Sequence, residues 1–122
     1  MNTKRDARPE WWFLCLAGLP ALSTILVYGE ACIASLMLGH WPIPYVDDPK
    51  QLATAPLHVV SRLVLLAVLP GAIFLAAVSI KNWRTLRTSH VYWPWIGFLV
   101  VSLAFLLWIS RTETRTWAWW AD

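Results

Sequence analysis

The chain carries little charge. Only 14% of its 122 residues are Asp, Glu, Lys or Arg, whereas roughly a quarter are charged in a soluble protein. Three long stretches, Trp11 to Gly29, Leu63 to Ile80 and Tyr92 to Ser110, contain no charged residue at all. A helix that spans a membrane needs about 20 mainly apolar residues, and each stretch reaches that length with few or no flanking residues. The scarcity of charge therefore excludes an ordinary soluble domain and predicts an all-α membrane protein with three transmembrane helices.

The three expected spans leave little chain for anything else. We place them at about residues 11–38, 56–80 and 92–110, with a first connection at 39–55 and a second at 81–91. Residues 1–122 then form a single integral membrane domain, and we expect no soluble catalytic domain attached to it. The first apolar run is about twice as long as the 7–15 residues of a signal-peptide core, and no A-x-A site closes it. We therefore expect this span to be a retained anchor.

Cysteine is scarce as well, with only Cys15 and Cys32. Both fall in the first expected span, roughly 25 Å apart at about 1.5 Å per residue, so they cannot form a disulfide with each other. We expect two buried side chains that behave as small apolar residues. An intermolecular disulfide or a lipidated thiol is the alternative.

The basic residues form no continuous patch, which argues against nucleic acid as a partner. They flank the expected spans instead, so three crossings divide them between the two sides of the membrane. One side holds Lys4, Arg5, Arg8, Lys81, Arg84 and Arg87, and the other holds Lys50, Arg111 and Arg115. Cytoplasmic loops are richer in Lys and Arg. We therefore expect a cytoplasmic N-terminus and a C-terminus that is periplasmic or extracellular, in the inner (plasma) membrane of a bacterium.

Tryptophan, in contrast, is abundant, with ten residues. Most of them lie near the ends of the expected spans, where an apolar ring with one polar N–H fits the membrane–water boundary. The pattern predicts two interfacial belts. For the run Trp117-Ala118-Trp119-Trp120, an aromatic cage around a ligand is the alternative to a belt.

The first connection has the most specific sequence, Gly39-His40-Trp41-Pro42-Ile43-Pro44-Tyr45-Val46-Asp47-Asp48-Pro49-Lys50. Its three prolines restrict the backbone and predict a stiff, proline-rich outer loop. Asp48 is expected to cap a short interfacial helix, with Pro49 in its first position and Gln51 completing a capping box. This helix should run until just before Pro56. A chemical role for Asp48 is the alternative.

The run GHWPIPYVDDPK resembles a motif found in small, uncharacterised bacterial integral membrane proteins. The resemblance covers this dozen residues, and the remainder of the chain only as a pattern of three or four spans. It implies a bacterial inner-membrane protein. It implies no mechanism, and it transfers no catalytic role to His40, Asp47 or Asp48.

Two ionisable residues lie inside the expected spans, Glu30 in the first and Arg62 in the second. Unpaired charges there cost several kcal/mol, and their similar depth predicts an ion pair between them. His58 lies one turn before Arg62 and shares its helix face. We therefore expect Glu30, His58 and Arg62 to form a polar cluster beneath the loop that carries His40, Asp47 and Asp48.

This cluster has two interpretations. It is a structural ion pair that fixes two spans against each other, or a site that binds an anion, a metal or a lipid headgroup, or relays protons. Two His, two Asp and one Glu could ligate zinc, but their spacing matches no zinc signature. We expect no cofactor.

Two classes of function follow from these patterns. The first is a non-enzymatic accessory or interaction subunit, which packs its helices against another membrane protein or a second copy of itself. The second is a small membrane enzyme or transporter component, with the outer-leaflet cluster as its site. The absence of any catalytic signature favours the first class. In either class, we expect the protein to be embedded in the lipid bilayer.

Overall fold

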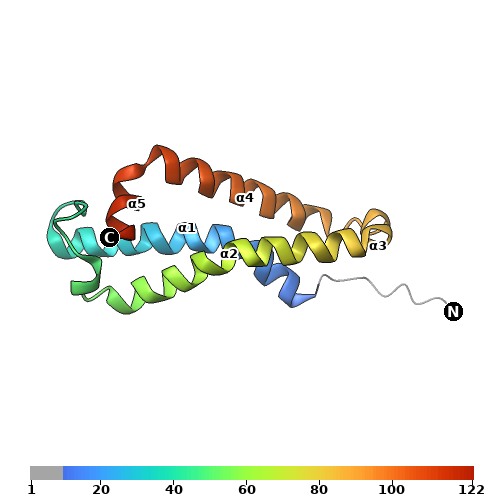
Figure 1. Ribbon diagram of the computed structural model, residues 1–122, viewed down its shortest axis with the longest axis horizontal. Helices are drawn as coiled ribbons and strands as arrows, with labels where there is room; N and C mark the ends of the chain where they lie inside the picture. The colour runs from blue at the N-terminus through green and yellow to red at the C-terminus, as the bar shows by residue number, and fades with distance from the viewer. Residues whose placement is uncertain (1–9) are drawn as a thin grey trace.

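A computed structural model describes residues 10–122 and contains only helices and connecting segments in that range (Figure 1). Three helices are long and apolar enough to cross a membrane: α1 (Trp11–Leu38), α2 (Ala55–Lys81) and α4 (Trp93–Thr112). Their bounds agree within a few residues with the three spans expected from the sequence. The chain is thus an all-α, multi-pass membrane protein. Of the basic residues counted above, Lys4, Arg5 and Arg8 lie outside the described residues.

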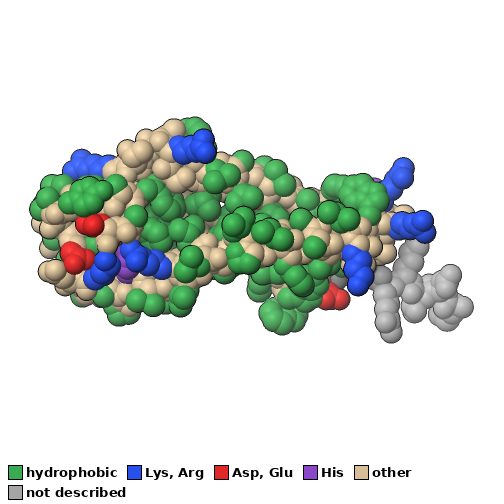
Figure 2. Space-filling view, in the orientation of Figure 1, with side chains coloured by type: hydrophobic (Ala, Val, Ile, Leu, Met, Phe, Trp, Pro, Cys, Tyr) green, Lys and Arg blue, Asp and Glu red, His purple; other side chains and the backbone are tan. Residues whose placement is uncertain are grey.

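Helix α1 contacts both α2 and α4, and α2 crosses it near its middle (Figure 1). Its buried residues recur every three or four positions and so form one stripe along the helix: Phe13, Ala17, Pro20, Ser23, Val27, Glu30, Ala31 and Ala34. The outer faces of the long helices carry large exposed apolar side chains. Charged side chains gather instead at the two ends of the visible face (Figure 2). This distribution suits a bundle whose sides face lipid.

Helices α1 and α2 approach each other closely at Gly71, which is buried and follows Pro70 inside α2. A Cβ atom on residue 71 would lie 3.0 Å from Cδ1 of Leu19 and 3.4 Å from Cδ2 of Leu16. The missing side chain therefore makes room for the leucines of α1. Packing between spanning helices depends on such small residues, because lipid is as apolar as the leucines themselves.

Helix α1 ends at Gly39, whose left-handed backbone (φ 74°) lets its N–H bond to the carbonyl of Ser35. The loop that follows reaches a 3-10 helix, η1 (Pro49–Gln51), and we call this end of the bundle the loop end. Asp48 caps η1 as expected: its carboxylate accepts from the N–H of Lys50 at 2.8 Å.

The interfacial helix is shorter than expected. It ends at Gln51, since Leu52 is extended (ψ 159°), and does not continue to Pro56. The expected capping box is also incomplete: the Gln51 side chain donates from Nε2 to the carboxylate of Asp48 at 3.1 Å, whereas a capping box requires its Oε1 to accept from the Asp48 N–H.

The second connection contains a short helix, α3 (Trp83–Thr88), that the sequence pattern did not predict. Its indole at Trp83 packs edge-to-face against Trp93, the first residue of α4, with ring centroids 5.9 Å apart. This contact fixes the turn from α2 into α4.

A fifth helix, α5 (Thr114–Ala121), also lies outside the expectation. It follows α4 after the single residue Glu113 and folds back toward α1 at the loop end (Figure 1). Trp119 is fully buried there and Trp120 is 6% exposed. The expectation that these two indoles belong to an interfacial belt is therefore wrong.

The expected burial of the two cysteines is wrong as well: Cys15 and Cys32 are both exposed on α1. In a soluble helix a small apolar residue would favour the core. In a spanning helix the outer face is apolar too, so the residue type does not decide which face it occupies.

Candidate functional site

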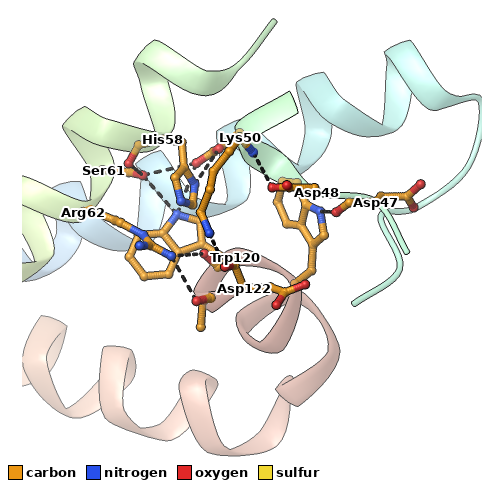
Figure 3. A network of polar contacts seen from close by, with 11 residues as sticks. Asp47, Asp48, Lys50, His58, Ser61, Arg62, Trp120 and Asp122 are labelled. Atoms are coloured by element: carbon orange, nitrogen blue, oxygen red, sulfur yellow. Dashed lines mark hydrogen bonds and ion pairs between the residues drawn. The ribbon is translucent and has the colours of Figure 1, made fainter. Parts of the chain in front are cut away.

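Glu30 lies at the centre of the buried polar contacts at the loop end. Its side chain is inaccessible to solvent, eight residues or about 12 Å before the end of α1. Nδ1 of His58 lies 3.0 Å from Oε1. Ser61 Oγ and Trp120 Nε1 both donate to Oε2, each at 3.1 Å. We call Glu30, His58, Ser61 and Trp120 the Glu30 cluster; Figure 3 shows its contacts.

The sequence explains how three helices meet at this carboxylate. His58 and Ser61 are three residues apart, hence on one face of α2, and both are buried there. On α1, the small side chains of Ala31 and Ala34 leave room for indoles, and both pack against Trp119 and Trp120 in one hydrophobic cluster. This packing of α5 also lets Nε1 of Trp120 donate to Oγ of Ser61 at 3.0 Å.

Arg62 does not pair with Glu30, which corrects the ion pair expected from the sequence. The close titratable neighbour of Glu30 is His58, whose Nδ1 lies 3.0 Å from Oε1. Arg62 donates from Nη2 to the carbonyl of Ala121 at 3.0 Å and to that of Trp120 at 3.5 Å. Its guanidinium carbon also lies 5.6 Å from the centre of the Trp120 ring. The carbonyl end of α5 thus supplies the acceptors that Arg62 needs within the membrane span, and a partly negative helix C-terminus suits a cation.

The loop residues form a separate group. Nδ1 of His40 lies 3.8 Å from the carboxylate of Asp47, which also accepts from the N–H of Ile43 at 2.9 Å. Asp48 is occupied by its cap of η1. In the part of the chain that the structure describes, none of His40, Asp47 and Asp48 bonds to Glu30, His58 or Arg62. The single cluster expected from the sequence is therefore two clusters.

Helix α5 joins the loop to the bundle. Trp119 Nε1 donates to the main-chain oxygen of Asp47 at 2.6 Å, and Trp41 Nε1 donates to Oγ1 of Thr116 at 3.1 Å. Sequence reasoning missed Thr116, Trp119 and Trp120 because α5 itself was not expected. Ser61 was also missed, although a hydroxyl one turn after His58 in an apolar span was a usable signal.

The chemistry open to the Glu30 cluster is narrow. Among residues 10–122, no three His, Cys, Asp or Glu side chains come together in an arrangement that could hold a metal ion. One feature favours a chemical role for the cluster: Nε2 of His58 is buried and has no hydrogen-bond partner, whereas most buried polar atoms in proteins have one.

Neither Glu30 nor His58 lines any of the four main cavities along the described helices. Two of these four cavities are grooves with a bearing on function. One, of about 290 Å³, runs between α1 and α4, and the other, also of about 290 Å³, lies between α2 and α5. The first is lined by Ala21, Thr24, Ile25, Phe98, Val101, Ser102 and Phe105, and the second by Arg62, Leu65, Leu66, Trp120 and Ala121.

The fold and the site define a class: a multi-pass membrane protein with a closed polar core near one end of its bundle. Comparison of the chain with models of protein families, with curated proteins and with solved structures finds no match.

Proposed function

We propose that this chain is a non-enzymatic accessory protein of a membrane assembly, which acts by packing its apolar helix faces against another membrane protein. One observation carries the proposal: the carboxylate of Glu30 is completely buried, and the side chains of His58, Ser61 and Trp120 hold it by hydrogen bonds. A reactive or transporting carboxylate needs access for a substrate or an ion. A carboxylate enclosed by His58, Ser61 and Trp120 serves instead to hold three helices together.

The groove between α1 and α4 suits a partner helix. Its two hydroxyl residues bond to their own helices, Thr24 to the carbonyl of Pro20 and Ser102 to that of Leu99. The surface they present is therefore apolar. Ala21, Thr24 and Ser102 are also small, which allows a neighbouring backbone to approach closely.

We further propose the inner membrane of a bacterium as the location, with the loop end facing outward. Lys81, Arg84 and Arg87 lie at the α3 end of the bundle. The positive-inside tendency favours the cytoplasm for that end, and the resemblance of residues 39–50 to bacterial membrane proteins supports the choice of membrane.

A small membrane enzyme or transporter component is the second candidate. The unpartnered Nε2 atom of His58 favours it, because a buried imidazole next to a carboxylate is suited to proton transfer. Such a function would require α5 to move, since Trp120 covers the pair.

Co-purification from the native host in mild detergent separates the two candidates. The wild-type chain is compared with Val101→Trp, which fills the α1–α4 groove, and with Leu69→Trp, a matched control on α2. Val101 and Leu69 are both 68% exposed. We expect a stoichiometric membrane-protein partner with wild type and the control, and its loss with Val101→Trp. A folded protein that purifies alone in all three cases contradicts the accessory function.

A further inference from the structure

Arg62 has more hydrogen-bonding capacity than the protein uses. A guanidinium has five N–H donors, and every hydrogen bond that Arg62 makes within residues 10–122 comes from Nη2. No Asp or Glu side chain of the described chain forms an ion pair with it, since both pairs there involve histidine. The guanidinium is therefore a cation with free donors and no carboxylate partner among these residues.

A second cation lies at the same place. Nζ of Lys50 donates to the main-chain oxygen of Asp122, next to the Ala121 carbonyl that Arg62 contacts. In Figure 3 both side chains reach the carbonyl end of α5 beside Trp120. A helix C-terminus attracts cations, and the carboxylate of Asp122 lies at the same end but forms no ion pair with either cation in the described range. Lys50 likewise forms no ion pair with an Asp or Glu side chain in the described range.

The groove below these cations is apolar. Arg62 and Trp120 line it together with Leu65 and Leu66 of α2, and Leu66 is 73% exposed. Arg62 lies seven residues or about 10 Å into α2, a depth from which a long side chain extends its charge toward the headgroup region. A groove with the cation of Arg62 at one end and leucines along its wall is complementary to an amphiphile with an anionic head and an apolar chain.

We propose that the α2–α5 groove binds an anionic phospholipid of the outer leaflet. Its phosphate accepts hydrogen bonds from Nη1 and Nε of Arg62, and one acyl chain lies along Leu65 and Leu66. Arginine suits this task because its planar fork matches a phosphate. The bound lipid holds the guanidinium of Arg62, which contacts α5, and so keeps that helix in place over Glu30. This site lies apart from the α1–α4 groove and is independent of the proposed partner.

The test is lipid binding to the full chain in detergent, by native mass spectrometry and by thermal unfolding. The probes are phosphatidylglycerol, phosphatidylcholine with the same acyl chains, and glycerol phosphate as the free headgroup. We expect phosphatidylglycerol to bind and to raise the unfolding temperature, with phosphatidylcholine at least several-fold weaker and glycerol phosphate without effect. Equal binding of the two lipids overturns the proposal, and so does an equal effect of the free headgroup.

Variants localise the site. Arg62→Gln should weaken phosphatidylglycerol binding about tenfold, as expected for the loss of a charge-assisted hydrogen bond. Arg111→Gln, an exposed arginine at the end of α4, should leave it unchanged. Because Arg62→Gln also removes contacts to α5, Leu66→Trp provides a second variant that fills the groove and spares those contacts. Retained binding in Leu66→Trp contradicts the proposed site.

Discussion

Nδ1 of His58 and Oε1 of Glu30 lie 3.0 Å apart in the interior of the bundle. The two residues belong to neighbouring spans, and their side chains are 3% and 0% exposed. A carboxylate in a membrane span needs hydrogen-bond donors, and here an imidazole, a hydroxyl and an indole supply them. The pair therefore connects α1 to α2 at a fixed depth, and Trp120 extends the connection to α5.

The indole of Trp120 should contribute to stability through its N–H as well as through its size. Trp120→Phe keeps a six-membered aromatic ring but removes the N–H that donates to Glu30 and Ser61, which should cost roughly 1.5–3 kcal/mol of unfolding free energy. Trp117→Phe is the matched control, since Nε1 of Trp117 has no partner. Chemical unfolding in detergent measures both, and an equal loss in the two variants would contradict the role of the Trp120 N–H.

Asp48 should act as a helix cap and not as a chemical group. Asn caps about as well as Asp, so Asp48→Asn should be nearly neutral, whereas Asp48→Ala should cost about 0.5–2 kcal/mol. Thermal unfolding in detergent compares the two. If Asn and Ala do equal damage to function while the fold stays intact, the carboxylate charge of Asp48 matters and the cap does not account for it.

The close approach of α1 and α2 should depend on the missing side chain at residue 71. Gly71→Leu places a branched chain against Leu16 and Leu19, and overpacking of this kind costs about 1–3 kcal/mol. Gly97→Leu in α4 serves as the control, because nothing lies within 4 Å of a Cβ atom there. Similar unfolding temperatures for the two variants would show that the helices do not cross at Gly71.

The proposed orientation is open to a direct test. Reporter fusions near Arg87 should report the cytoplasm, and fusions near Lys50 the opposite side, because the charge bias favours the α3 end as cytoplasmic. The reverse pattern would place the loop end inside the cell and move the proposed lipid site to the inner leaflet.

The sequence was sufficient for the three spans, because hydrocarbon thickness sets a length that uncharged stretches reveal directly. It also singled out Glu30 and His58, since polar residues are conspicuous in an apolar helix. It did not predict the partner of Glu30 correctly. Arg62 and His58 share a helix face, and spacing alone does not show which of them points inward.

The remaining errors around the Glu30 cluster trace to α5. Indoles suit both a membrane boundary and a protein interior, so the run from Trp117 to Trp120 gave no sign that two of its rings are buried. Only the fold-back after Glu113 brings Trp120 to Glu30 and provides Arg62 with carbonyl acceptors. These contacts join residues 90 and 59 positions apart, which local patterns do not encode.

The central claim is that His58, and not Arg62, is the side-chain partner of Glu30 in a structural core. Two double-mutant cycles in the free energy of unfolding test it most directly, one with Glu30→Leu and His58→Leu, the other with Glu30→Leu and Arg62→Leu. Residues in contact couple by about 0.5–3 kcal/mol, so we expect the His58 cycle to fall in that range and the Arg62 cycle to be clearly smaller. A larger coupling for Arg62, or additive losses for Glu30 and His58, would contradict the account.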